Sequence, residues 1–197
     1  GWHNVLALAM IPLALVVIAF SLMAKDSPST STGQPMRRYL AALKHSDMWW
    51  FCLFYSVTFG GYVGLGSFLP IFFRDQYGVD PLTAGYLTAL ATFVGSMVRP
   101  FGGYFADRVG GTRLLSVVFI GIFGTYLLGA QLPSLPVMVT LLVIGMACLG
   151  LGNGAVFQLV PQRFADQIGI ATGVVGAVGG LGGFFLPNIL GSAKQIS

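Results

Sequence analysis

The sequence predicts an all-α, polytopic membrane protein, and three observations lead to this fold class. Of the 197 residues, 55% are hydrophobic and only 8% are charged, whereas a soluble domain carries about 25% charged residues. The mean hydropathy is +0.82. Six apolar runs are each long enough to cross a bilayer as a helix, which needs about 18 or more residues. The chain therefore belongs in lipid.

The six predicted membrane spans are separated by segments rich in Pro, Gly, Ser, Asp and basic residues, which are typical of loops. We expect the spans at residues 5–23, 48–73, 82–105, 114–132, 135–160 and 168–190. The first run also has the position of a signal peptide. Its apolar region is too long for one, no Lys or Arg precedes it, and Lys25 follows it as a stop-transfer residue would, so we predict a true span.

The basic residues of the loops predict which side of the membrane each loop faces. Cytoplasmic loops of membrane proteins carry an excess of Lys and Arg. If the loop after the first span is cytoplasmic, that side holds Lys25, Arg37, Arg38, Lys44, Arg108, Arg113 and Arg163, and the opposite side holds Arg74 and Lys194. This bias of seven against two predicts that both ends of the chain face outward.

Composition and motif content exclude several functions. The formal net charge is +4, but the basic residues are scattered over loops with no polar domain to carry them, so we expect no nucleic-acid partner. Cys52 and Cys148 lie in apolar runs without neighbours at metal-ligand spacing, which favours small buried hydrophobic residues over a disulfide or a metal site. The sequence has no Glu and no catalytic set of Ser, His and Asp. We therefore expect neither an enzyme nor a bound cofactor.

Arg99 is the one charged residue placed inside an apolar run. A guanidinium there costs roughly 2.5–3.5 kcal/mol on an insertion scale, and it does not escape by losing its proton. Such a residue is normally retained because an anion meets it, which points to a membrane protein that handles a small anion. Alternatively, Arg99 lies only about six residues from the cytoplasmic edge, and its long side chain could extend to the headgroups. The residues alone leave both interpretations open.

The loop after this run carries a motif. It reads Gly103-Tyr-Phe-Ala-Asp107-Arg108-Val-Gly110-Gly-Thr-Arg113, which follows G-x-x-x-D-[RK]-x-G-x-[RK] with the last basic residue one place late. This resembles the cytoplasmic loop motif of the major facilitator superfamily. Gly103 would let a neighbouring helix approach closely, and Asp107 would cap the next helix or pair with an Arg. The loop would then latch one conformation at the cytoplasmic face. An ordinary charged turn is the alternative.

Two glycine-rich stretches indicate which family of the superfamily the chain resembles. Residues 150–161 read GLGNGAVFQLVP, and residues 173–187 read GVVGAVGGLGGFFLP. The second stretch is similar to the glycine-rich nitrate signature of the nitrate/nitrite porters (NarK type) of the superfamily. The likeness covers essentially the whole chain and implies family helices six to eleven, which are six transmembrane helices of an original twelve. Glycines at this spacing also serve helix packing. The first stretch loosely fits a dinucleotide-binding fingerprint, but no strand precedes it.

The resemblance implies a substrate site. Arg99 matches the family's substrate arginine in helix eight, and its flat guanidinium suits two parallel hydrogen bonds to planar nitrate. Tyr55 and Phe59, at i and i+4, match the aromatic pair of helix seven, a hydroxyl donor and a phenyl wall. Without the resemblance, packing between helices would be the preferred interpretation of this pair. Asn153 is either an interhelical hydrogen-bonding residue or a second donor. The glycines expected at the site are Gly176, Gly179 and Gly180.

The function implied is transport of nitrate and nitrite by alternating access, in a multi-pass protein of the bacterial inner membrane. Residues 1–24 would end an N-terminal half, residues 25–47 would form a cytoplasmic linker, and residues 48–197 would form a C-terminal half without its last helix. The expected partners are nitrate, nitrite, the bilayer and the remaining helices of the same transporter. No titratable side chain lies well inside a span, which favours anion exchange. The alternatives are a superfamily porter for another small anion and a membrane anchor without a transport role.

Overall fold

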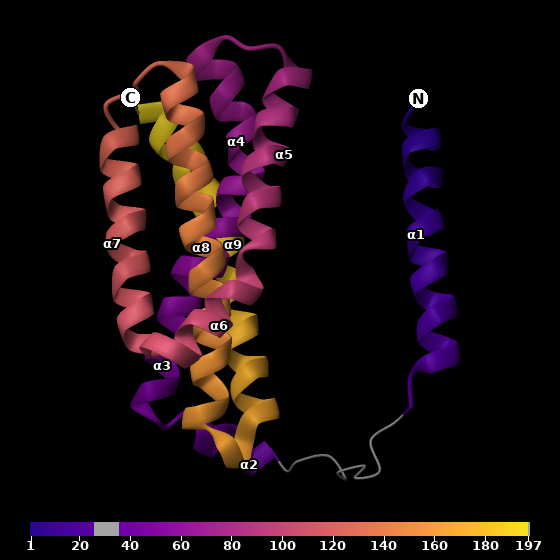
Figure 1. Ribbon diagram of the computed structural model, residues 1–197, viewed down its shortest axis with the longest axis vertical. Helices are drawn as coiled ribbons and strands as arrows, with labels where there is room; N and C mark the ends of the chain where they lie inside the picture. The colour runs from indigo at the N-terminus through magenta and orange to yellow at the C-terminus, as the bar shows by residue number, and fades with distance from the viewer. Residues whose placement is uncertain (26–35, 197) are drawn as a thin grey trace. The chain divides into compact units, whose positions relative to one another are not determined.

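The structure, a computed structural model, describes residues 1–25 and 36–196. The chain divides into two compact units, Gly1–Met36 and Arg37–Ser197. Six helical segments among the described residues are long and apolar enough to cross a membrane, which confirms all six predicted spans (Figure 1). No strand occurs in the two described ranges. The protein is therefore an all-α, multi-pass membrane protein.

The first unit contains one apolar helix, α1 (Trp2–Met23), with Pro12 inside it. Its 22 residues make it about 33 Å long at 1.5 Å per residue, enough to cross the hydrocarbon core. Of the predicted linker, residues 26–35 lie outside the described residues, and α2 (Met36–Ala42) follows them. The division of the chain into a span, a linker and a partial second half stays a prediction.

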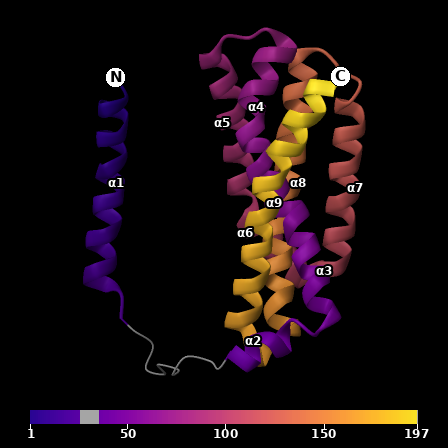
Figure 2. The same ribbon diagram turned by 180° about the vertical axis from the view of Figure 1, so that it is seen from behind.

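The second unit is a bundle of long helical segments whose connections lie alternately at its two ends (Figures 1 and 2). After α2 its elements are α3 (Ser46–Tyr55), the π-helical turn η1 (Ser56–Gly60), α4 (Gly61–Tyr77), α5 (Pro81–Met97), α6 (Arg99–Val109), α7 (Gly111–Gly129), α8 (Leu135–Arg163), the 3-10 turn η2 (Ala165–Gln167) and α9 (Ile168–Ile196). One span is built from α3, η1 and α4, and another from α5 and α6.

Two of the predicted loops are shorter in the structure. Arg74 lies inside α4, and Asp107 lies inside α6. Both positions were expected in loops because they are charged. They remain helical because their exposed side chains are close to a helix end, where they reach beyond the apolar layer. The connection between α4 and α5 consequently shrinks to residues 78–80, and that between α6 and α7 to Gly110.

Local signals fix these two connections. Gly78 ends α4 in the left-handed conformation with φ 65°, which glycine adopts without steric cost. Asp80 caps α5 by accepting hydrogen bonds from the backbone N–H groups of Leu82 (3.0 Å) and Thr83 (3.1 Å). Hydrogen bonds from Thr83, through its side chain and its backbone, and from Leu82 hold the pKa of Asp80 below its usual range. Gly110 turns the chain into α7 with φ 90°.

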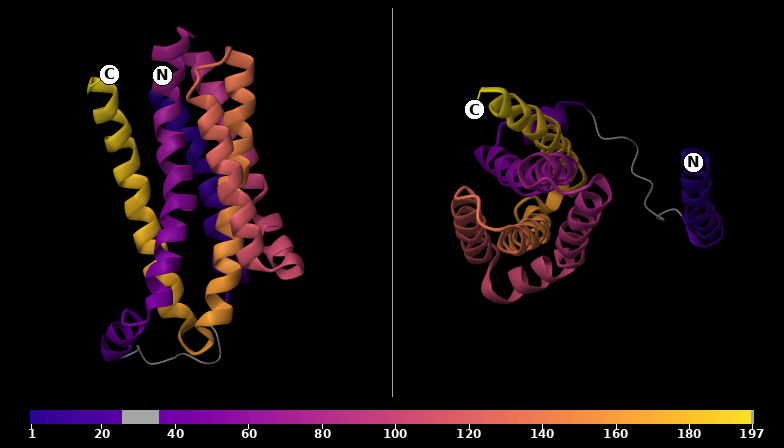
Figure 3. Two further views of the ribbon diagram at one scale, coloured as in Figure 1. Left: turned by 90° about the vertical axis from the view of Figure 1, so that its left-hand side faces the viewer. Right: turned by 90° about the horizontal axis from the view of Figure 1, so that it is seen from above.

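Helix α8 lies at the centre of the second unit, in contact with α5, α6 and α7, and α9 packs on α3, η1 and α4 (Figure 3). Glycines make the central contacts close. A side chain at Gly150 of α8 would collide with the backbone carbonyl of Gly95 in α5, and one at Gly154 with that of Arg99. The α5–α6 segment therefore rests on α8 backbone to backbone, as small residues allow in membrane helices.

Candidate functional site

Arg99 stands at the break between α5 and α6. Pro100 follows it and has no backbone N–H, so the helix does not continue smoothly through this point. The Cζ of Arg99 lies 4.2 Å from the ring centroid of Tyr62 and 5.7 Å from that of Phe59. Its Nε is buried without a hydrogen-bond partner. The side chain of Arg99 makes no hydrogen bond and no ion pair with any described residue. The site thus holds a cation that no carboxylate of the described chain neutralises.

Aromatic rings form one wall beside this cation. The rings of Tyr55 and Phe59 stack with centroids 5.0 Å apart and an interplanar angle of 3°. Phe157 of α8 meets Tyr55 edge to face at 4.8 Å. Tyr55 ends α3 and Phe59 lies in η1, and π-helical turns of this kind are frequent at functional sites. The structure brings Tyr55, Phe59 and Arg99 together; their role in binding stays a prediction.

Sequence reasoning missed Tyr62, whose ring lies nearest to Arg99. Its hydroxyl donates to the backbone oxygen of Thr92 (2.6 Å) and lies 2.6 Å from Oγ of Ser96. A signal was present, because Tyr62 follows Tyr55 and Phe59 at helical spacing of seven and three residues and therefore shares their face.

Asn153 of α8 is 5% exposed, and neither polar atom of its amide has a hydrogen-bond partner in the described part of the chain. Its neighbours on the same helix face are Leu149, which contacts Gly61, and Phe157, which contacts Tyr55. Asn153 therefore lies at a level between the start of α4 and the end of α3, beside the π-helical turn. It makes no interhelical hydrogen bond to a described residue, which leaves its amide available to another group.

The three predicted glycines of α9 lie in different surroundings. Gly179 is buried, and a side chain there would collide with the ring of Tyr55. At Gly176 and Gly180, an added methyl group would have no atom of another described residue within contact distance, so both glycines face open space within this unit. The neighbouring contacts of α9 are made by Gly182, against Ser56 and Gly60. One glycine of the predicted set thus supports the aromatic wall directly.

The loop motif is arranged differently from the expectation. Asp107 neither caps α7 nor pairs with an Arg among the described residues; its Oδ1 accepts a hydrogen bond from Nε2 of Gln158 in α8 at 2.5 Å. Arg108 stacks on Tyr104, with its Cζ 4.2 Å from the ring centroid. The close helix approach expected at Gly103 is made instead by Gly102, against the backbone of Leu151.

The remaining residues of the motif make few contacts around the turn between α6 and α7. A side chain at Gly103 would meet only the carbonyl of Gly154 at an ordinary 3.8 Å, Gly110 makes the turn, and Arg113 is exposed. The motif therefore ties α6 to α8 through Asp107 and Gln158, and its gating role stays a prediction.

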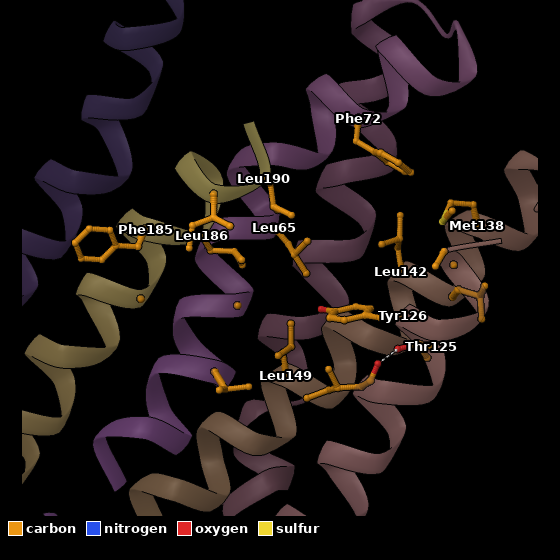
Figure 4. A pocket seen from close by; sticks show the side chains of 18 of the residues that line it. Leu65, Phe72, Thr125, Tyr126, Met138, Leu142, Leu149, Phe185, Leu186 and Leu190 are labelled. Carbon is orange, nitrogen blue, oxygen red and sulfur yellow. Dashed lines mark hydrogen bonds between the residues drawn. The ribbon is translucent and has the colours of Figure 1, made fainter. Parts of the chain in front are cut away.

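A large cavity lies away from Arg99. It has a volume of about 640 Å³ and is lined by α4, α7, α8 and α9, with Leu65, Tyr126, Leu142 and Leu186 among its walls (Figure 4). Thr125, at its edge, donates its hydroxyl to the backbone of its own helix at 2.9 Å. Neither Arg99 nor Phe59 lines it. Its walls are mostly apolar and, among the described residues, include no Lys, Arg or His, so we place the candidate site at Arg99 and not in this cavity.

A multi-pass helical bundle with an intramembrane cation that no described residue pairs defines a membrane protein of the transporter class. The sequence profile of the Major Facilitator Superfamily matches residues 1–187, and the chain belongs to this superfamily. The family is one of transporters and not of enzymes.

Within the superfamily, the chain is similar to several curated relatives. The chain is 34% identical to the "Nitrite extrusion protein" of Bacillus subtilis over 195 aligned residues. The alignment covers 99% of this chain and 49% of the relative. The chain is 32% identical over 203 residues to the "Probable nitrate transporter NarT" of Staphylococcus epidermidis, covering 100% and 51%. It is 32% identical over 222 residues to the "Probable nitrate/nitrite antiporter NarK1" of Thermus thermophilus, covering 98% and 48%. The predicted resemblance is confirmed, and the chain spans about half the length of these relatives.

Proposed function

We propose that the protein containing this chain transports nitrate and nitrite across the cell membrane, with the anion bound at Arg99. The observation that supports this most directly is the guanidinium of Arg99, which lies within a membrane span, with its Nε buried, and has no ion-pair partner among the described residues. The relatives are named for nitrate and nitrite.

The chemistry of the site suits a small planar anion. A guanidinium fork donates two parallel hydrogen bonds to two oxygens of one anion, and these charge-assisted bonds are about twice as strong as neutral ones. The stacked rings of Tyr55 and Phe59 exclude water and so strengthen the electrostatic attraction. The buried amide of Asn153 supplies a further donor on the α8 side. The anion would then meet donors from two different helical segments.

Alternating access needs a second group of helices that moves against this bundle. The chain spans about half of its relatives, and we propose that the other half and a last helix of the same protein complete the anion site. The contact between Asp107 and Gln158 lies near the end of α6 and α8, where it would hold these two helices together during the movement.

Uptake of labelled nitrate by the full-length protein in liposomes tests this function. We expect Arg99→Lys to reduce uptake at low nitrate about 10- to 100-fold, because a lysine does not reproduce two parallel charge-assisted hydrogen bonds. Arg74→Lys is the matched control, since Arg74 is exposed and pairs with Asp75, and it should leave uptake unchanged. Wild-type uptake by Arg99→Lys would contradict the assignment.

Competition distinguishes the substrate class. Unlabelled nitrite and chlorate should inhibit uptake of nitrate, because they present the same small, delocalised charge. Inhibition by small carboxylates alone would instead identify a porter for organic anions.

A further inference from the structure

We propose that Tyr62 is a positioning residue that holds the Arg99 guanidinium ready for the anion, a role that rests on the proposed function of Arg99. Cζ of Arg99 stands 4.2 Å from the centroid of the Tyr62 ring. A cation at this distance from an aromatic face is attracted by the quadrupole of the ring, and more strongly where water is excluded. The ring attracts the guanidinium without offering an acceptor oxygen, so the N–H groups stay free for a ligand.

The ring itself is held at its far end. The Tyr62 hydroxyl donates to the backbone oxygen of Thr92 at 2.6 Å and lies 2.6 Å from Oγ of Ser96. Thr92, Ser96 and Arg99 follow one another at helical spacing of four and three residues, so they share one face of the α5–α6 segment. Tyr62 is therefore attached to the same face, and the same segment, from which the arginine projects.

A glycine makes this arrangement possible. A methyl group at Gly95 would lie 2.7 Å from Cε2 of Tyr62, which is closer than such atoms approach. Gly95 thus provides the space for the ring between Thr92 and Arg99. Because the ring is bound to this segment at its hydroxyl, its edge and its face, Tyr62 and Arg99 are expected to keep their relative geometry when the helices move.

Positioning by a ring has a consequence that positioning by an acid would not have. A carboxylate beside Arg99 would neutralise the guanidinium and compete with the anion for its N–H groups. Without any support, the long side chain of an arginine near a helix end can extend toward the headgroups. The Tyr62 ring prevents this extension and leaves the charge uncompensated, which is the state that an anion-binding site requires.

Kinetics of nitrate uptake by the full-length transporter in liposomes test the proposal. We expect Tyr62→Leu to raise KM for nitrate about 3- to 30-fold, the range of a cation–π contact at a partly to fully desolvated site, with a much smaller change in Vmax. Tyr62→Phe keeps the ring and should restore KM to within about threefold of the wild type. Tyr86→Leu is the control, because Tyr86 lies on α5 but is 67% exposed, and it should leave KM unchanged.

A purely structural role of Tyr62 would lower the amount of folded protein and Vmax without moving KM, and that result would overturn the proposal. If Tyr62→Leu fails to insert, Tyr62→Met provides the second variant: it fills the same space with a flexible apolar side chain, removes the aromatic face and should raise KM in the same way. Loss of uptake in Arg99→Lys together with a wild-type KM in Tyr62→Leu would overturn the role of Tyr62 alone. A wild-type KM in both variants would overturn the proposed function of Arg99 as well.

Discussion

At the scale of single residues, the side chains of Arg99 and Asn153 share one property: each holds a buried polar atom without a hydrogen-bond partner in the described part of the chain. An unpaired buried amide costs about 1–3 kcal/mol of stability. Asn153 belongs to α8, one turn from Leu149 and Phe157 on the face that meets the π-helical turn and the aromatic wall. This cost is offset if a bound ligand accepts hydrogen bonds from the amide N–H groups of Asn153. The amide would then act as a donor in the bound state.

We therefore expect Asn153→Leu to have opposite effects on stability and binding. Replacing the unpaired amide by an apolar side chain of similar size should raise the thermal unfolding midpoint of the nitrate-free protein, while KM for nitrate should rise about 2- to 10-fold through the loss of one hydrogen bond. Thermal unfolding and uptake measure the two quantities. Asn188→Ala is the control, because Asn188 donates to the backbone of its own helix at 2.7 Å. A lower midpoint with an unchanged KM would show that Asn153 has a structural partner instead.

At the scale of helices, the contact of α9 with α3 and η1 depends on which glycines face inward. Gly179 and Gly180 are adjacent and chemically identical, yet the helix turns them in different directions. A side chain at Gly179 would enter the Tyr55 ring, whereas Gly180 is exposed and meets nothing within this unit. The backbone of α9 at Gly179 therefore packs directly against the Tyr55 ring of the stacked pair.

This difference predicts the effects of two matched substitutions. Gly179→Ala should displace Tyr55, lower the unfolding midpoint and weaken uptake of nitrate, because the ring is already packed against Phe59 and Phe157 and has little room to yield. Gly180→Ala should leave the midpoint within error of the wild type. Equal loss of stability in both variants would contradict this arrangement of α9.

At the scale of the whole molecule, much of the fold could be predicted from sequence because lipid imposes simple rules on it. Apolar runs long enough to span the bilayer become helices, since no other local structure satisfies the backbone there. The same reasoning could not place the helix ends, because Arg74 and Asp107 are charged and yet helical. Hydropathy indicates which segments prefer the apolar layer. Whether a charged residue near the end of such a segment stays helical depends on whether its side chain reaches beyond that layer.

The candidate site could be predicted only in part. Arg99 was visible as a charge in an apolar run, whereas Tyr55 and Phe59 were assigned to the site by the family resemblance and not by their helical spacing. Tyr62 and the Gln158 partner of Asp107 were not recognised, because both act through residues that are distant in sequence: Tyr62 through a segment 30 to 37 positions later, and Gln158 through a residue 51 positions earlier. The helical spacing of Tyr62 places it on the same face as Tyr55 and Phe59. Its contact with Arg99, like the contact of Gln158 with Asp107, depends on tertiary structure and leaves no local pattern in the sequence.

The positions of the titratable groups bear on how transport is driven. A proton-coupled site normally needs an Asp, Glu or His within the membrane. The sequence has no Glu, and the described carboxylates lie at or close to helix ends: Asp47 pairs with Arg163 where α3 begins and α8 ends, and Asp75 pairs with Arg74 near the end of α4. His45 precedes α3. Arginine is a residue type that does not act as a proton carrier, so the charged group within the α5–α6 span offers no route for proton coupling.

These placements predict anion-for-anion exchange, in which one anion always neutralises the intramembrane arginine while the helices move. Liposomes that contain the full-length transporter, loaded with nitrite and placed in labelled nitrate, measure this directly. We expect nitrate entry to require internal nitrite and to be insensitive to an imposed pH gradient, because moving the unneutralised charge of Arg99 through the hydrocarbon would cost several kcal/mol. Liposomes loaded with gluconate are the control for leak. Accumulation of nitrate in those liposomes under a pH gradient alone would show that proton-coupling residues lie elsewhere in the transporter and that this half does not determine the coupling.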